Sequence, residues 1–311
     1  MTSNRLSRFR GMRLLKPAAV IFLFPACAWP QAAQLRTAGQ VLDRYKRALG
    51  GEQAIANIRS MTVRGEAEST GTPGKATFVY YAKPFKTLFK LTRVDGTQIA
   101  AGFNGNVSWT MTPKGAEIDK DTALDAIRRD ADLQYPLHQP DYFKKLELAG
   151  IRDFEGHRCY WLHGTTNWGK DNNQFYDVET GLLAGYRFES DDPSKTLTVA
   201  IFEDYRNFGG PLIATRNTTR AGQNRQIFTY KSVSYEPLAD SIFELPPAVK
   251  ALEPVSQILP IVDNRQIKAP SIMLCAVVVS KFSQRHNFLG RSQFWLDSGG
   301  RTCQPIAYLN T

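Results

Sequence analysis

The sequence predicts a mainly β protein, in which one curved antiparallel sheet forms an unclosed β-barrel beneath a helical lid. Between residues 60 and 246, short segments alternate apolar and polar residues, which is the two-residue period of strands with one buried face. Gly, Asn, Asp and Pro turn signals separate these segments, so neighbouring strands are expected to pair locally. One helical stretch, residues 121–146, interrupts the series and is long enough to cover an open sheet.

Two short helices are expected before the first strand. Residues 38–49 carry apolar side chains at helical spacing, and Gly50-Gly51 supplies a stop signal. A second helix is expected over residues 52–58. The strand at residues 61–68 then alternates small apolar residues with polar ones, which leaves room for a partner on its dry face.

The remaining strands follow from the same alternation. Asp95-Gly96 and Asn104-Gly105 are strong hairpin signals between neighbouring segments. The expected strands are residues 76–82, 87–94, 98–103, 107–112, 158–164, 174–178, 182–190, 196–207, 212–219 and 225–236.

The helical stretch begins at Asp121, a candidate N-cap, and ends where Pro136 and Pro140 interrupt it. A further helical turn is expected to start at Asp141. The apolar stripe of this stretch fits two arrangements, a lid across an open sheet or a plug that fills the core, because both bury the same residues. Beyond the sheet, residues 248–270, which include Pro254 and Pro260, are interpreted as a linker.

Residues 1–28 predict a secretory signal. Basic residues precede an apolar run of about eleven residues, and Ala26-Cys27-Ala28 fits a small-x-small cleavage site. The run is shorter than the roughly twenty residues that a membrane-spanning helix needs. A competing interpretation is a lipoprotein signal, in which Cys27 becomes the lipidated N-terminus. We therefore expect an exported, periplasmic protein, with a lipid anchor at Cys27 as the alternative.

Composition narrows the function classes. The chain has 311 residues, 42% of them hydrophobic, which is enough for one large β domain and an appendage. The net charge is +10, and about half of it lies in the predicted signal. No block of Lys and Arg with interleaved aromatic residues occurs, which argues against nucleic acid. The four cysteines show no CxxC spacing, so neither a metal site nor a cofactor is expected.

Several segments between residues 38 and 247 form a familiar pattern: Tyr45 with Ala48 to Gly51, Ile58-Arg59-Ser60 with Gly65, and residues 175–182, 202–206, 209–215 and 240–246. These segments resemble outer membrane lipoprotein-sorting proteins of the LolA/LolB/LppX superfamily. The resemblance implies a curved antiparallel sheet that forms an unclosed barrel, with helices on its concave side and a hydrophobic cavity for acyl chains. It also implies ligands that range from lipoproteins and other lipids to signalling partners.

The resemblance leads us to expect a monomeric carrier or sensor that binds a lipid or a lipidated protein, with an envelope membrane as a further partner. Burial of an acyl chain contributes about 0.8 kcal/mol per methylene. For each dry-face candidate alone, plain core packing competes with a role in the cavity. The candidate ligand-binding residues are Phe78, Tyr80, Leu88, Phe103, Trp109, Tyr160, Leu162, Phe175, Phe188 and Phe202.

Residues 294–300 resemble the active-site loop of retropepsin-like aspartic proteases, and the match rests on Asp297, Ser298 and Gly299. In that chemistry two aspartates share one proton and activate water. An exported aspartic peptidase is therefore the alternative function. Only fourteen residues follow Asp297, whereas a domain of this kind needs about a hundred. We expect residues 271–311 to be a truncated, poorly ordered and inactive tail.

Other catalytic signals are weak. His157 and His163 share one side of an expected strand, but no acidic residue lies between them and a metal site needs three or four ligands. No GxSxG segment, phosphate-binding loop or dinucleotide fingerprint occurs. We therefore expect a binding protein and no enzyme.

Overall fold

The computed structural model describes residues 34–119, 122–188 and 197–252. The predicted signal at residues 1–28 with Cys27, and the tail at residues 271–311 with Asp297, Ser298 and Gly299, lie outside the described residues. The description below concerns the compact unit that begins at Leu35.

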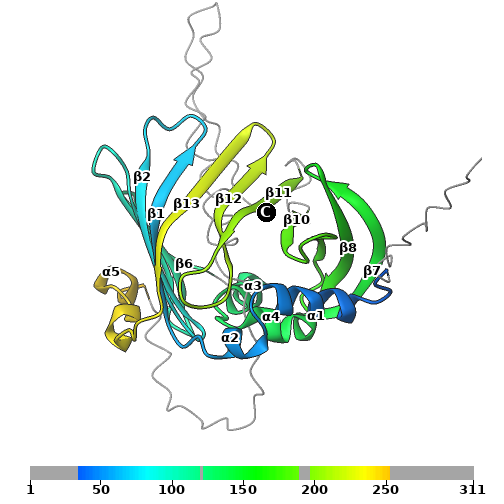
Figure 1. Cartoon of the computed structure of the whole chain (residues 1–311). Coiled ribbons are helices and arrows are strands. Elements are labelled where there is room, and N and C mark those ends of the chain that lie inside the picture. The colour runs from blue at the N-terminus through cyan, green and yellow to red at the C-terminus, as the bar shows by residue number, and fades with distance from the viewer. Residues whose placement is uncertain (1–33, 120–121, 189–196, 253–311) are drawn as a thin grey trace, which may run out of the picture. The chain divides into compact units, whose positions relative to one another are not determined.

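The described residues form one antiparallel sheet of thirteen strands (Figure 1). Strands β1 to β6 form one meander and β7 to β13 form the other, and the pairing of β1 with β13 joins them. The two edge strands are β6 and β7, so the sheet is not closed. The strands are β1 (Met61–Ser69), β2 (Ala76–Lys83), β3 (Lys86–Thr92), β4 (Gln98–Phe103), β5 (Ser108–Thr112), β6 (Gly115–Ile118), β7 (Phe143–Phe154), β8 (His157–Thr166), β9 (Asp171–Asp177), β10 (Leu183–Phe188), β11 (Thr198–Arg206), β12 (Ile213–Ala221) and β13 (Asn224–Ser234).

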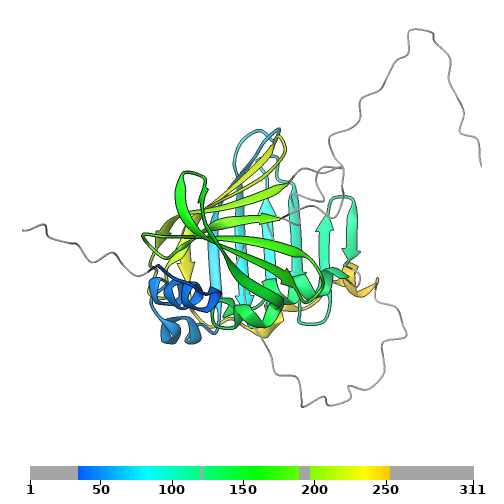
Figure 2. The same ribbon diagram turned by 90° about the vertical axis from the view of Figure 1, so that its right-hand side faces the viewer.

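The helices are few and short, and Figure 2 shows them along one end of the curled sheet, with α1 and α2 in blue. Among the described residues they are α1 (Ala38–Ala48), α2 (Glu52–Ala56), α3 (Thr122–Asp130), α4 (Tyr135–His138) and α5 (Pro247–Lys250), with the 3-10 turns η1 (Gln139–Tyr142) and η2 (Asp240–Phe243). The expected fold class, a mainly β protein with an unclosed antiparallel sheet and a few helices, is confirmed.

The inner face of the sheet, defined here as the face that carries Val63, Tyr80 and Phe89, holds the main core. These three residues lie opposite one another on β1, β2 and β3, so their side chains form one row. Apolar residues of α1 and α2 pack against this core. A Cβ at Gly65 would lie 2.8 Å from the Phe78 ring, so the small residue noted in the sequence lets that ring lie flat on β1.

The outer face is covered by the segment that follows β13. Leu88 and Trp109 pack there against Phe243, Leu245 and Val249. Figure 1 shows α5 outside the curve of the sheet. Residues 248–250 of the expected linker belong to α5, and Val249 is fully buried in the cluster beneath this cover.

Two strands were not predicted. The turn of helix expected from Asp141 ends at Tyr142, and β7 begins at Phe143. In β7, Leu146 pairs with Gly164 and Leu148 with Leu162 on β8. The two leucines are separated by one charged residue, a spacing that fits a strand. Pairing with β8 therefore favours a strand over the helical turn that was expected here. The short edge strand β6 holds only four residues, too few for a clear alternation.

Candidate functional site

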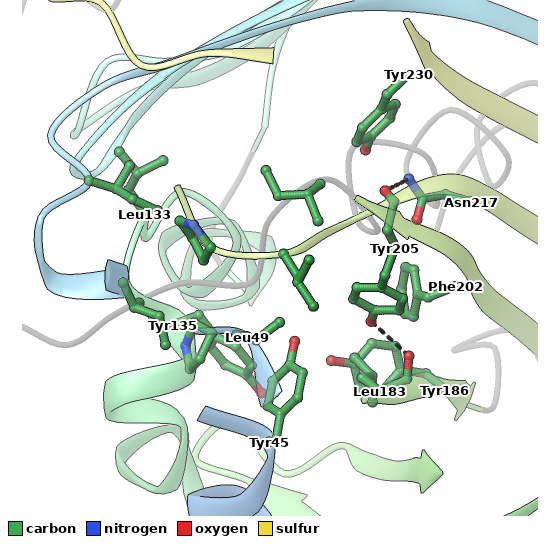
Figure 3. Close-up of a pocket in the computed structure, with 17 residues that line it drawn as sticks. Tyr45, Leu49, Leu133, Tyr135, Leu183, Tyr186, Phe202, Tyr205, Asn217 and Tyr230 are labelled. Carbon is green, nitrogen blue, oxygen red and sulfur yellow. Dashed lines mark hydrogen bonds between the residues drawn. The ribbon is translucent and has the colours of Figure 1, made fainter. Parts of the chain in front are cut away.

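A cavity of about 100 Å³ lies between the inner face of the sheet and the helices α1, α2 and α4 (Figure 3). None of the described residues that line it carries a charge at neutral pH. The lining residues are Tyr45, Leu49, Ile55, Ile58, Leu133, Tyr135, Pro136, Leu183, Tyr186, Phe202, Tyr205, Pro211, Leu212, Ile213, Ala214, Asn217 and Tyr230.

The wall on the α1 side is fixed by the sequence around that helix. Thr37 and Gln40 form a capping box, in which the Thr37 hydroxyl accepts a hydrogen bond from the Gln40 backbone N–H at 3.2 Å. Gly50 and Gly51 both adopt positive φ, which ends α1 and turns the chain into α2. This geometry turns Tyr45, on the last turn of α1, toward the cavity.

The wall on the α4 side is held by polar contacts. The Gln134 side-chain amide donates to the carbonyl oxygens of Ala56 at 2.8 Å and Ile58 at 3.3 Å, which ties the start of α4 to the end of α2. Asp132, which is 3% exposed, accepts hydrogen bonds from the Tyr142 hydroxyl and the Gln134 backbone N–H, both at 3.0 Å. Burial raises the pKa of the Asp132 carboxyl to about 8, and the hydrogen bond from Tyr142 opposes this shift only in part.

Four tyrosines, Tyr45, Tyr135, Tyr186 and Tyr205, form what we call the tyrosine cluster. Figure 3 shows the rings of Tyr45, Tyr186 and Tyr205 directed at the same part of the cavity. The Tyr205 hydroxyl donates to the Leu183 carbonyl oxygen at 2.8 Å. Burial raises the pKa of all four hydroxyls above the usual tyrosine value, so they remain neutral hydrogen-bonding groups.

Behind the tyrosine cluster lies a buried polar layer. The Gln139 side-chain amide donates to Gln174 and to the Tyr176 hydroxyl, the latter at 2.8 Å. The Arg129 guanidinium pairs with Asp130 at 2.8 Å and lies 5.2 Å from the centre of the Trp168 ring. The guanidinium is thus paired with a carboxylate, so the layer supports the cavity wall without bringing an unpaired charge to it.

A larger groove, of about 980 Å³, lies beside the segment that covers the outer face. Leu88, Trp109 and Met111 contribute to it, but charged residues line it as well, among them Arg64, Glu66, Lys90 and Lys231. An acyl chain in this groove would lie against charged groups that prefer water. Volume alone therefore does not identify the candidate site, and lining chemistry favours the smaller inner cavity.

The ten candidate ligand-binding residues fall into four clusters. Six belong to the inner core or pack against it: Phe78, Tyr80, Tyr160, Leu162, Phe188 and Phe202. Of these, Phe202 lines the cavity described above. Phe103 packs against Ile127 and Ala131 of the segment that contains α3.

The other three candidates lie elsewhere, so the ten candidates do not all belong to one cluster. Leu88 and Trp109 lie beneath the outer cover. Phe175 stacks on Phe154 at a centroid distance of 4.3 Å in a separate cluster. Alternation within a strand separates its two faces but does not say which face is concave, and both faces of this sheet bury aromatic residues.

Sequence reasoning missed most of the residues that line the cavity, including Tyr135, Tyr186, Tyr205 and Asn217. The signal for Tyr45 was present, because it lies on the apolar stripe of the first helix and in the segment that resembles the sorting proteins. Tyr186 lies in an expected strand opposite Ala200, two residues before Phe202, so register would have placed it beside that candidate.

The two histidines considered as metal ligands lie beside polar side chains of neighbouring residues. His157 lies 3.3 Å from a carboxylate oxygen of Asp177, and His163 lies 3.1 Å from the Asn173 side chain. In the part of the chain that the structure describes, no group of three metal-ligating side chains occurs and no helix is long and apolar enough to cross a membrane. The peptidase interpretation rests on residues outside the described ranges and stays a prediction.

Among known proteins, similarity to this chain is found only in solved structures. No protein-family model matches the chain. No curated protein matches it. A DUF1329 family protein from Desulfovibrio piger has a TM-score of 0.48 at 15% identity, covering 66% of this chain and 96% of its own. A LolA superfamily protein from Nitrosomonas europaea also has a TM-score of 0.48, at 13% identity, covering 68% and 99%. The class defined here therefore rests on the topology itself: an unclosed antiparallel sheet with an uncharged hollow on its inner face.

Proposed function

We propose that this protein is an exported lipid-binding or lipidated-protein-binding carrier or sensor of the cell envelope, which takes an acyl chain into the cavity on its inner face. The observation that carries the proposal is the chemistry of that cavity. Its described lining combines aliphatic and aromatic side chains and contains no ionised group. Such a surface stabilises a hydrocarbon chain and gives no advantage to a charged ligand.

The size of the cavity implies that its walls move when a ligand binds. Ligand sites usually enclose about 300 to 1,000 Å³, and this cavity encloses about 100 Å³. The sheet wall is joined strand to strand by backbone hydrogen bonds from β6 to β7. The helical wall includes α2, with five residues, and α4, with four, and helices this short are marginal on their own. The helical wall is therefore the part that yields.

The energy available from a chain is sufficient for such a movement. Burial of ten methylenes contributes about 8 kcal/mol at about 0.8 kcal/mol each. Displacing the Gln134 side chain from its two carbonyl partners costs about 1 kcal/mol for each hydrogen bond. The balance favours a bound state in which α4 has shifted, and no covalent bond is made or broken in the exchange.

Lipid extraction tests the proposal directly. The protein is purified without detergent and extracted with organic solvent, and the molar ratio of lipid to protein is determined by mass spectrometry. We expect close to one lipid per protein. In parallel, displacement of the uncharged dye N-phenyl-1-naphthylamine measures binding of added lipids.

A cavity-filling variant supplies the matched comparison. Ala214→Phe places a ring among the lining residues on β12, and we expect it to weaken dye and lipid binding at least tenfold. Ala116→Phe on β6, which packs in the outer cluster, is the control and should bind like the unaltered protein. Absence of lipid together with equal dye binding by both variants would refute the proposal.

A further inference from the structure

The polar groups of the inner cavity are neutral. They are the hydroxyls of its tyrosines and the Asn217 side-chain amide. A carboxylate or phosphate that entered this cavity would lose its water and meet no cation in the lining. The cavity can therefore distinguish ligands by charge as well as by the length of their apolar part.

The Arg129 cation, which interacts with two tyrosines of the cluster, does not change this conclusion. Arg129 interacts electrostatically with Tyr135 and Tyr186, which line the cavity. Both Nε and Nη2 of Arg129 point to one carboxylate oxygen of Asp130, at 2.9 and 2.8 Å. An anionic ligand would have to compete with a carboxylate that is already buried and in contact.

One hydroxyl at the cavity wall is available to a ligand. Tyr186 is 2% exposed and lines the cavity, and its hydroxyl has no hydrogen-bond partner among residues 34–119, 122–188 and 197–252. By contrast, the neighbouring Tyr205 hydroxyl is already used by the Leu183 carbonyl. An O–H group held in an apolar cavity without an acceptor is unfavourable, and a ligand acceptor would relieve that cost.

We propose that the cavity selects an uncharged lipid, an acyl chain in ester or amide linkage, whose carbonyl oxygen accepts a hydrogen bond from Tyr186. The inference rests on the proposed chain-binding function and adds the chemical class of the ligand. Beside Tyr186, the Phe202 ring lies at a centroid distance of 5.4 Å in an edge-to-face arrangement. Leu183 and Ile213 also line the cavity, so the chain that follows the carbonyl meets apolar side chains.

Three ligands with the same chain length test the inference: methyl decanoate, decanoate and decane. Each is titrated at pH 7.5 against protein loaded with N-phenyl-1-naphthylamine. We expect methyl decanoate to bind at least tenfold tighter than ionised decanoate and about fivefold tighter than decane. In Tyr186→Phe, the ester should lose its advantage over decane, while decane binds as before and so reports an intact cavity.

Tyr81→Phe, a change of the same kind in a side chain that packs in the outer cluster, should leave all three affinities unchanged. Binding of decanoate as tight as the ester, or an ester advantage that survives in Tyr186→Phe, would overturn the inference while the chain-binding proposal stands. Failure of all three ligands to displace the dye would overturn both.

Discussion

The two faces of the sheet carry two different covers. On the outer face, η2 and α5 follow directly from β13 and close on Leu88 and Trp109, with Val249 fully buried. On the inner face, α1, α2 and α4 leave a cavity against the strands. Neighbouring residues of one strand serve both, since Leu88 faces the outer cover and Phe89 the inner core.

The covers also differ in how they are attached. The outer cover is held from the surface, where the Lys83 ammonium contacts Asp240 at 2.8 Å and the Leu238 carbonyl at 3.0 Å. The inner cover is held by buried groups, above all Asp132 and Gln134. A cover that packs without a cavity contributes to stability, whereas one that leaves a cavity can open for a ligand.

The largest effect is expected from Trp109→Ala. Removing this buried ring from beneath the outer cover should lower the free energy of unfolding by about 4 kcal/mol in urea titrations. Dye binding to the folded fraction should not change.

Phe202→Ala, at the cavity wall, should lower the free energy of unfolding by only about 2 kcal/mol, because the ring is partly exposed and borders space that is already empty. This substitution should also alter dye affinity.

The contrast between these two substitutions separates the covers. If Phe202→Ala destabilised the protein as much as Trp109→Ala and left dye affinity unchanged, the inner face would be an ordinary packed core. The distinction between a fixed and a movable cover would then be wrong.

The strands of the sheet could be predicted from the sequence because the signals that define them are local. Alternation and turn signals such as Asn104-Gly105 fix where strands begin and end, and the structure has hairpins at these turns. The two meanders meet through β1 and β13, a pairing between residues about 160 positions apart that no local signal encodes. The helical stretch was predicted as such, yet its end at Tyr142 was decided by pairing with β8.

The candidate site depends on curvature, which residue patterns do not record. Trp109 and Phe202 are both aromatic residues in alternating strands, but one lies beneath the outer cover and the other lines the inner cavity. The tyrosines that line the cavity come from α1, α4, β10, β11 and β13, and only the curl of the sheet and the position of the helices bring them together.

The next largest effect, taken per pH unit, is expected from pH acting on Asp132. An unfolded aspartate ionises near pH 3.9, whereas burial raises the pKa of this carboxyl to about 8 in the folded protein. Between these values the folded state binds more protons, so the free energy of unfolding should fall as pH rises from about 4 to 8, by at most about 1.4 kcal/mol per pH unit.

Asp132→Asn removes this titration. The unfolding free energy of the variant should depend less steeply on pH between 5 and 8 than that of the unaltered protein, as measured by urea titrations at each pH. Dye should also bind faster to the unaltered protein at pH 9 than at pH 6, because the ionised carboxylate loosens the inner cover. Equal pH slopes in both proteins would show that Asp132 is not the group responsible.

A smaller effect is expected from Gln134→Ala, which removes the two hydrogen bonds from α4 to Ala56 and Ile58. The cost in unfolding free energy should be about 1 to 2 kcal/mol, and amide hydrogen exchange should accelerate in α2 and α4 but not in α5. The control is Gln53→Ala, which removes an exposed contact to Asn57 within the α2 region. Faster exchange in α5 would show that the two covers are coupled.

The smallest effect is expected from Asp240→Asn at the edge of the outer cover. The hydrogen bond from Lys83, and then the charges of Lys83 and Lys86, lower the pKa of this carboxyl. Its contribution is therefore present above the unfolded pKa near 4 and is lost as pH falls through the folded value. The variant should show a slightly lower melting temperature at pH 7, a difference that shrinks in high salt and disappears in acid. Because Asp132 responds in the opposite direction, a melting-temperature difference for Asp240→Asn that grew toward alkaline pH would contradict the assignment of the two carboxyls to separate covers.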